Sequence, residues 1–344
     1  MNLEPRTKRQ SHPTVSIIII DYKENNPYLV ECLDAIQKQS FKNYEIILIT
    51  DYKNNLSYPK LSKKHYGKYV GPSEKRDDGA KMAKGEILAF IDDDAYPHKD
   101  WLKNIVKNFE GKNIVGVGGP GVTPPNVSII EEASGWASAS PFGSGTYLYR
   151  FLPRKKRFVE DYPSMNLAVR RKEFLEVGGY DSNYWPGEDT KLCLDLVSKT
   201  NQKIIYDPKV LVYHHRRPVL KPHLRQNGNF GLHRGFFAKV LPKTSHRLIY
   251  FLPSFFLIYV ALLVSFVIAN FRISGIEAIP TIKIVIFSPL AVYFFLLFLN
   301  SIWILTFSKK MAQALLSVPV IFITHLWYGV RFLQGLLFTD KLKQ

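Results

Sequence analysis

The 344-residue chain is strongly basic, with 46 Lys and Arg residues against 29 Asp and Glu residues. A charge of this sign favours acidic partners such as nucleotides, phospholipid head groups or nucleic acids. Its two cysteines, Cys32 and Cys193, exclude a disulfide framework and a cysteine-rich zinc site, and they fit a reducing compartment. Residues 1–13 are polar and lack the apolar core of a signal peptide, so we expect an N-terminal tail.

The first ninety residues alternate between strand-like and helix-like segments. Continuous apolar runs predict buried strands at 15–20, 44–49 and 87–91, and Tyr69-Val70 predicts a short extra strand. Apolar spacing predicts a helix over 28–39, and the segment 79–84 is expected to be a second one. This β-α-β-α-β order predicts an α/β fold with a mostly parallel sheet and right-handed crossovers.

The middle of the chain continues the alternation less regularly. Helical periodicity covers 101–109, and an apolar run at 114–117 predicts another strand. The segment 124–157 is rich in Gly, Ser and Pro, and we expect mobile loops there. Two further strands, 165–169 and 210–213, are predicted on either side of a helix at 189–198.

A carboxylate triplet, Asp92, Asp93 and Asp94, directly follows the apolar run 87–91. Open α/β folds bind their ligands at the carboxyl ends of the strands. Adjacent carboxylates repel one another unless a cation lies among them, and a hard divalent ion held by carboxylates and substrate phosphates is a common solution. The triplet therefore predicts a metal–diphosphate site, with a solvated turn or a helix cap as the alternative.

Composition changes sharply near residue 248. Three long apolar runs follow, at 248–269, 284–307 and 311–338, each longer than the roughly 20 residues that span a bilayer as a helix. The third run is less pure, because it carries His325, Arg331 and Gln334. We predict a transmembrane region over 248–338 with two to three helices, in preference to buried core helices.

Basic residues around these runs predict the orientation. Lys and Arg precede the first run, and Lys309 and Lys310 separate the second from the third, so we expect a multi-pass cell-membrane protein with residues 1–247 in the cytoplasm. Lys341 and Lys343 disagree with three spans, and a re-entrant third segment is left open. The basic segment 221–247, with Phe230, Phe236 and Phe237, is predicted to lie at the membrane interface, ahead of the spans and of a tail at 339–344.

Several short motifs occur in a specific order. They are Val15–Glu24, Glu45–Asp51, Arg76–Gly79, Asp92–Asp94, Gly178–Asp181 and Gly187–Asp189. In this order the chain resembles the family 2 glycosyltransferases of the GT-A fold that carry C-terminal membrane segments, over about residues 14–235. It departs from them at Ile20-Asp21, where the family has Pro and a small residue, at Thr50, where it has Asp, and at Asp77, where it has Asn.

The resemblance implies a GT-A domain over 14–220 and an inverting transfer that uses Mg²⁺ or Mn²⁺. A sugar would pass from a UDP-, GDP- or dTDP-sugar to a lipid-linked or polysaccharide acceptor, and nucleic acid is not expected as a partner. One alternative is a processive polysaccharide synthase, whose Gln-x-x-Arg-Trp motif is not found at Gln226. The other is a non-catalytic basic membrane scaffold, which would need no acids at strand ends.

The resemblance also implies roles for individual donor-side residues. Asp94 is expected to be the main metal ligand, with Asp92 second. Asp92 or Asp93 would accept hydrogen bonds from the ribose hydroxyls. Asp51 would bind the base, and Arg76 the base or the diphosphate; the alternatives are a capping acid and a surface arginine.

On the acceptor side, Asp189 is the expected catalytic base, with Glu188 as the alternative. Inverting transfer needs a carboxylate that takes the proton of the acceptor hydroxyl, and a helix N-terminus favours the ionised acid that such a base requires. A plain N-cap would look the same in sequence. His214 or His215 could complete the metal shell or hold the diphosphate, or belong to a basic face near the membrane, and Arg154–Arg157 is expected to contact anionic lipid or a phosphorylated acceptor.

Overall fold

The computed structural model of the protein describes residues 13–272 and 280–342, so the predicted tail at 1–13 lies outside it except for Pro13. The chain forms two compact units. The first comprises Met1–Gly119, Arg157–Tyr180 and Asp195–Val212, and the second comprises Pro120–Lys156, Asp181–Leu194 and Tyr213–Gln344.

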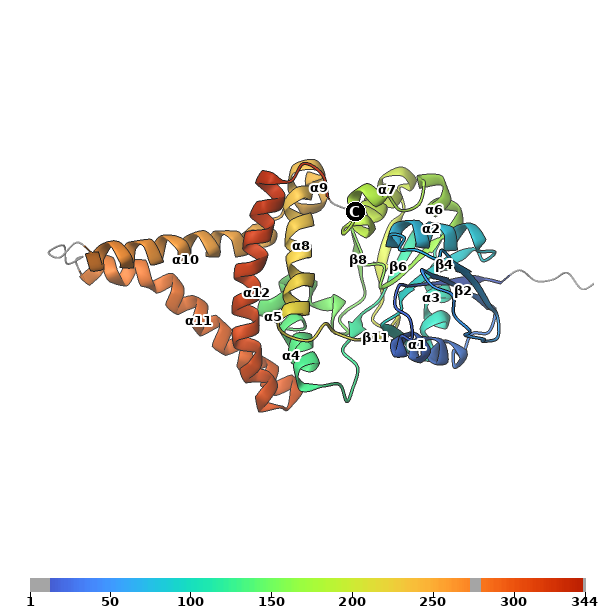
Figure 1. Ribbon diagram of the computed structural model, residues 1–344, viewed down its shortest axis with the longest axis horizontal. Helices are drawn as coiled ribbons and strands as arrows, with labels where there is room; N and C mark the ends of the chain where they lie inside the picture. Colours follow the sequence, from blue (N-terminus) through green and yellow to red (C-terminus); the bar gives the residue numbers. More distant parts are fainter. Residues whose placement is uncertain (1–12, 273–279, 343–344) are drawn as a thin grey trace, which may run out of the picture. The chain divides into compact units, whose positions relative to one another are not determined.

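An eight-stranded sheet organises the first unit, in the order β3-β2-β1-β4-β9-β6-β10-β8 (Figure 1). The strands are β1 (Val15–Asp21), β2 (Tyr44–Thr50), β3 (Leu61–His65), β4 (Ile87–Asp92), β6 (Ile114–Gly118), β8 (Arg157–Val159), β9 (Asn166–Arg170) and β10 (Lys203–Tyr206). Strand β1 runs parallel to both β2 and β4, while β9 runs antiparallel to β4 and β6. The predicted mostly parallel α/β sheet is confirmed.

Helices cover both faces of this sheet. On one face α1 (Pro27–Gln37) and α3 (Trp101–Phe109) share a buried apolar cluster with Ile17 and Ile19 of β1. On the other face Gly79 of α2 (Pro72–Met82) lies so close to Ile18 that a Cβ there would be 2.6 Å from its Cγ2. Because β1 has apolar side chains in both directions, it is buried on both faces, as a central parallel strand must be.

Two elements of the first unit differ from their predictions. The extra strand is not at Tyr69-Val70 but at β3, whose sequence Leu-Ser-Lys-Lys-His is polar because it pairs only with β2, at the sheet edge. Helix α2 begins at Pro72, several residues before the predicted start at 79. Its inner face carries the buried Lys75 and Arg76, so the apolar spacing that marks other helices is missing.

The stretch expected to be loops, 124–157, is largely helical, and that prediction was wrong. It contains α4 (Ile129–Ser138), α5 (Pro141–Ser144) and the 3-10 turn η1 (Gly145–Arg150). The side chains of Ser128 and Ser140 cap α4 and α5. Serine and glycine therefore act here as caps and close contacts within helices rather than as loop formers.

Within the residues that the structure describes, three short strands and seven helices complete the fold. The strands are β5 (Ala95–Pro97), β7 (Gly121–Val122) and β11 (Val212–His214); the helices are α6 (Arg171–Val177), α7 (Glu188–Thr200), α8 (Lys221–Val240), α9 (Pro242–Ser245), α10 (Leu248–Arg272), α11 (Pro280–Ser308) and α12 (Met311–Phe338), with a 3-10 turn η2 (Ser182–Tyr184). Three of the helices are long and apolar enough to cross a membrane, over Leu248–Ala269, Lys283–Ser308 and Met311–Phe338.

Helices α10 and α11 of the second unit form a hairpin (Figure 1). The rings of Phe256 and Tyr293 stack with centroids 4.0 Å apart. The hydroxyl of Tyr259 donates to the Ile286 carbonyl (2.8 Å) and accepts from the Leu290 amide (3.2 Å), so it stands between two groups that would otherwise bond to each other. Pro289 lies inside this turn of α11, and a hydroxyl inserted into the ladder satisfies groups at a proline site.

Helices α8 and α12 run side by side within the second unit (Figure 1). Glycines allow the backbones to touch: a Cβ on Gly235 would lie 2.0 Å from the Phe332 carbonyl, and a Cβ on Gly335 would lie 2.0 Å from the Leu232 carbonyl. The segment predicted as a basic interface, 221–247, is therefore mainly a helix that packs on the third apolar helix.

Candidate functional site

The acids of the first unit gather at one edge of the sheet. In the parallel register Asp21 lies beside Thr50, and Ile20 lies beside Asp92, so β1, β2 and β4 end together. Asp51 follows β2 directly, and Asp93 and Asp94 follow β4. This register places the carboxylates together at the carboxyl ends of neighbouring strands, as predicted.

Asp51 is held by a lysine that sequence analysis missed. The Lys75 ammonium lies 2.7 Å from Asp51 Oδ2 and donates to the Asp21 carbonyl at 3.1 Å, while the Val70 amide donates to Asp51 Oδ1 at 3.0 Å. Lys75 is only 2% exposed, and a buried charge of this kind needs a paired counter-charge. A lone lysine in a polar helix gives no periodic signal, which is why it was not singled out.

Arg76 occupies the next position of α2 and reaches the acidic triplet. Its Nη2 lies 3.0 Å from Asp92 Oδ1, and its guanidinium lies 5.5 Å from the centre of the Tyr180 ring. The side chain is buried, so the predicted alternative of a surface arginine is wrong. Adjacent residues of one helix thus hold Asp51 and Asp92.

Asp93 turns toward the loop after β1. Its Oδ2 accepts a hydrogen bond from Asn26, which also donates to Asp21 Oδ1 at 3.3 Å. Burial first, and then the neighbouring charges of Asp94, Asp21 and Asp92, raise the pKa of Asp93 well above its usual range. A carboxyl that holds its proton relieves part of the repulsion within the triplet.

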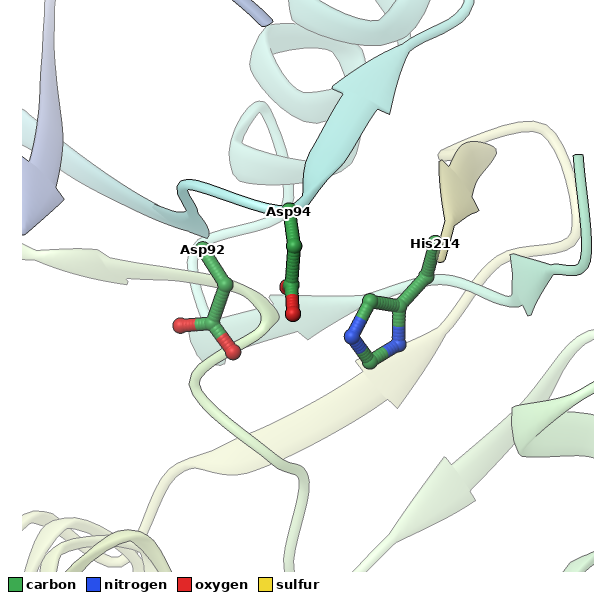
Figure 2. Close-up of side chains that lie close together, drawn as sticks. All are labelled: Asp92, Asp94 and His214. Atoms are coloured by element: carbon green, nitrogen blue, oxygen red, sulfur yellow. The ribbon is translucent and has the colours of Figure 1, made fainter. Parts of the chain in front are cut away.

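Asp92, Asp94 and His214 bring three metal-ligating side chains together, with one ligand atom of each inside a group no wider than 4.8 Å (Figure 2). Asp94 is 3% exposed and Asp92 is half-buried. His214 ends β11, two residues after Val212, which is part of the core of the first unit. Carboxylate oxygens suit Mg²⁺ and Mn²⁺ and imidazole suits the softer divalent ions, so this donor set fits a divalent cation.

The two adjacent histidines have different neighbours. His215 Nδ1 lies 2.9 Å from Glu131 Oε1, whereas His214 Nδ1 lies 3.1 Å from Arg216 Nη1. Because a guanidinium can only donate, His214 Nδ1 accepts, and the neutral ring then carries its proton on Nε2. Coordination through Nδ1 would have to displace Arg216, a residue that sequence analysis had placed only within a basic run.

The Gly178-Gly179 motif ends α6 and lies against Asp77 of α2. The amide of Tyr180 donates to Asp77 Oδ1 at 2.9 Å. A Cβ on Gly179, which has φ +76°, would lie 2.5 Å from the same oxygen, so glycine is required here both for conformation and for space. Burial raises the pKa of Asp77 to about 6, and the Tyr180 amide opposes this shift.

Glu188 and Asp189 belong to the second unit and open α7, one residue earlier than predicted. Asp189 Oδ1 accepts from the Thr190 amide at 2.7 Å and the side chain is half-buried, while Glu188 is 7% exposed. Acids in the first turn are stabilised in their ionised form by the positive end of the helix.

We compared the chain with families, curated proteins and solved structures. Residues 16–175 match the profile described as Glycosyl transferase family 2. The chain is 24% identical over 225 residues to the glucosyl-dolichyl phosphate glucuronosyltransferase of Haloferax volcanii, covering 58% of this chain and 68% of that protein. It is 23% identical over 255 residues to a Methanococcus voltae glucuronosyltransferase named for a dolichyl N-acetylglucosaminyl phosphate acceptor, covering 65% of this chain and 74% of that one.

Among solved structures, the mannosyltransferase PcManGT from Pyrobaculum calidifontis, described in complex with GDP-Man and Mn²⁺, superposes with a TM-score of 0.58 at 18% identity. The match covers 91% of this chain and 88% of that one, and it shows a shared fold. Sheet topology, strand-end acids and profile match together define a glycosyltransferase. The chain carries a glycosyl transferase family 2 domain of the GT-A fold, followed by helices of membrane length.

Proposed function

We propose that this protein is a membrane-attached inverting glycosyltransferase that moves one sugar from a nucleotide-sugar to a lipid-linked acceptor. The observation that carries the proposal is the convergence of Asp92 and Asp94 with His214 beside the strand ends of a glycosyltransferase domain. We assign the GT-A domain to residues 14–220 and the membrane region to 248–338, as the sequence predicted.

Asp94 and Asp92 would hold a Mg²⁺ or Mn²⁺ ion, with His214 as a third ligand. When bound there, the ion would offset the negative charge of the nucleoside diphosphate. Support comes from the donor set itself and from the Mn²⁺ named with the Pyrobaculum enzyme, which shares this fold.

The donor nucleotide would lie over the edge formed by β1, β2 and β4. Asp51, fixed by Lys75, is positioned to accept from a base N–H, and Arg76, fixed by Asp92, can turn its remaining donors to the base or the diphosphate. Asp93 already accepts a hydrogen bond from Asn26, so Asp92 is the better acceptor for a ribose hydroxyl. UDP-, GDP- and dTDP-sugars stay the candidate donors, and the GDP-Man named with the Pyrobaculum enzyme supports a GDP-sugar.

Asp189 would take the proton of the acceptor hydroxyl as that oxygen attacks the anomeric carbon from the side opposite the leaving group. Its place in the first turn of α7 favours the ionised form that a base needs at neutral pH. Glu188 remains the second candidate, although its burial makes access by an acceptor harder.

The acceptor is proposed to be lipid-linked for two reasons. The chain has helices of membrane length, and two of its relatives are named for dolichyl phosphate-linked acceptors. The catalytic residues would face the cytoplasm, since the basic residues around the spans lie on that side under the positive-inside rule.

A donor panel with matched variants tests this proposal. Purified protein in lipid bilayers would be given UDP-, GDP- and dTDP-sugars with Mn²⁺ and polyprenyl-phosphate lipids, and radiolabelled lipid product would be measured. We expect Asp94→Ala to reduce turnover at least 100-fold, and the exposed control Asp34→Ala to retain it. Unchanged turnover in Asp94→Ala would contradict the assigned metal site, and no product with any donor in the parent protein would contradict the function.

Asp189→Asn tests the base separately from the donor site. We expect turnover to fall about 100-fold or more, within the range that a general base contributes, while Mn²⁺-dependent nucleotide binding measured by calorimetry stays unchanged. If Asp189→Asn retains activity and Glu188→Gln loses it, the base is Glu188.

A further inference from the structure

The three apolar helices of the second unit are not equivalent in how much of their surface they leave uncovered. In α11, Phe294, Phe295 and Leu296 are all exposed, and three successive residues of a helix point in different directions. In α10 exposed apolar residues likewise recur around the helix, among them Leu252, Phe255, Leu262 and Val264. A helix that is apolar all round suits surrounding lipid.

Helix α12 shows a one-sided pattern instead. Its buried residues recur every three or four positions over 313–321 and again over 329–335, as Gln313, Ala314, Ser317, Val320, Ile321, Gly329, Phe332 and Gly335. Its exposed apolar residues, which include Leu315, Val330 and Leu337, lie on the opposite side. This is the burial of an amphipathic surface helix rather than of a span.

Helices α4 and α8 contact the buried side of α12 at several points, and α10 and α11 cover the rest, where Ile321 packs with Leu297 and Gly329 lies against the Pro253 carbonyl. At its start Lys310 and Gln313 contact Glu132 of α4, at 2.8 and 3.0 Å. In its middle Thr324 lies 2.9 Å from Nε2 of His223 on α8, whose pKa is lowered to about 4 by burial. Farther along, Gly231 and Gly235 of α8 lie against the Tyr328 and Phe332 carbonyls.

The register along α8 is parallel and continuous. His223 lies beside Thr324, Gly231 beside Tyr328 and Gly235 beside Phe332, so the two helices advance together. Helix α8 carries the charged residues Lys221, Arg225, Arg234 and Lys239 over its 20 residues. If α12 crossed the bilayer, α8 would cross with it, and charged side chains within the hydrocarbon core are costly.

We infer that α12 lies in the plane of the membrane surface, with α8 beside it, and that α10 and α11 alone cross the bilayer as a hairpin. The lipid partner is the anionic leaflet on the side of the catalytic domain: α12 presents its exposed apolar side to the acyl boundary, and the exposed Lys221, Arg225 and Lys239 face head groups. Lys341 then lies on the same side as Lys309 and Lys310, which removes its charge conflict with a three-span topology.

Cysteine labelling in sealed membrane vesicles tests the topology. Lys283→Cys marks the start of α11, Lys309→Cys its end and Asp340→Cys the residues after α12, and the native Cys32 and Cys193 are buried. We expect a membrane-impermeant maleimide to label positions 309 and 340 from one side and position 283 from the other. Labelling of 283 and 340 from the same side, with 309 opposite, would establish three spans and overturn the inference.

Spin labels separate an in-plane helix from a re-entrant one. Labels at Leu315, Ile323 and Leu337 are expected to show equal, shallow immersion when accessibility to oxygen is compared with that to a water-soluble nickel complex, against a deep reference at Leu262 of α10. A maximum of depth at Ile323 would show a re-entrant segment and contradict the inference. Neither measurement depends on which sugar the enzyme transfers, so a failure here leaves the proposed function standing, and the reverse also holds.

Discussion

Asp77 stands where the resembled family has Asn, and the burial of its carboxyl reduces the stability of the folded protein at neutral pH. Its buried carboxyl accepts from the Tyr180 amide, and desolvation raises its pKa to about 6. Between its ordinary pKa near 3.8 and that value, the folded protein binds more protons than the unfolded chain. The contribution of Asp77 to stability therefore falls as the pH rises from about 4 to about 6 and stays low at neutral pH.

The substitution Asp77→Asn should remove this penalty. Asparagine keeps the acceptor for Tyr180 and has no charge to bury, so we expect a higher midpoint of thermal unfolding at pH 7.5, by about 2–4 °C, and no gain at pH 4. Scanning fluorimetry of the detergent-solubilised protein at both pH values measures this. A drop in midpoint at pH 7.5 would mean that the charged carboxylate makes a favourable contact. Asp34→Asn, at an exposed position, is the control.

At this same scale the sequence predicted the site only in part. An acidic residue at the end of an apolar run is easy to recognise in a sequence, so Asp51, Asp92 and Asp94 could be predicted as site residues. Lys75 and Arg216 could not, because a single cation in a polar segment is indistinguishable from surface charge until the backbone brings its partner within reach. The choice between His214 and His215 needed the positions of Arg216 and Glu131 for the same reason.

At the scale of elements, the hairpin of α10 and α11 depends on a hydroxyl inside a helix. The Tyr259 side chain bridges the Ile286 carbonyl and the Leu290 amide beside Pro289. Tyr259→Phe keeps the ring but leaves both groups without that bridge in an environment that holds no water. We expect the loss to destabilise the hairpin by about 1–2 kcal/mol, near the upper range for hydrogen bonds within membranes.

Unfolding in mixed micelles of increasing denaturing-detergent content would reveal this loss as a lower midpoint. Tyr293→Phe, on the facing helix, removes a hydroxyl that contacts His325 rather than the backbone. It serves as the matched control and should cost less. Equal costs for the two variants would argue against a special role for the inserted hydroxyl.

Elements with a strong apolar period were predictable, and those shaped by their neighbours were not. The helix at 101–109 was predicted with its true ends because Trp101, Leu102 and Ile105 repeat on one face. Helices α4 and α5 were missed because their small residues reflect close packing, which local sequence does not encode. Strand β3 was missed because an edge strand can be as polar as a loop.

At the scale of the whole molecule, the long apolar helices also cover α8 within the second unit. A chain ending at Ser245 would lose α10 to α12, and with them the helix that covers Gly228, Gly231 and Gly235 of α8. We expect this truncated protein to leave the membrane after a salt wash only as aggregate, because the uncovered face includes Leu232 and Phe236, which lie against Gly335. Size-exclusion chromatography checks this, and a monodisperse soluble product would contradict the expectation.

Hydropathy predicted the three runs but could not say which of them cross the membrane. A run of apolar residues has the same composition whether lipid or protein covers one side of it. Whether α12 spans the membrane was inferred from which of its residues lie against α4 and α8. Those contacts depend on tertiary structure and cannot be predicted from hydropathy. The mostly parallel α/β sheet, by contrast, followed from the order of strands and helices, since parallel strands with right-handed crossovers allow few arrangements.

The parallel packing of α8 and α12 has a consequence for biosynthesis. About 70 residues separate the two helices, and at roughly 5–20 residues per second the ribosome completes α12 many seconds after α8. During that interval the hairpin of α10 and α11 must enter the bilayer. The face of α8 that carries Gly228, Gly231 and Gly235 stays uncovered meanwhile, because α12 has not yet been made. A nascent chain that stalls in this interval would expose the face of α8, around Gly231 and Gly235, that α12 later covers.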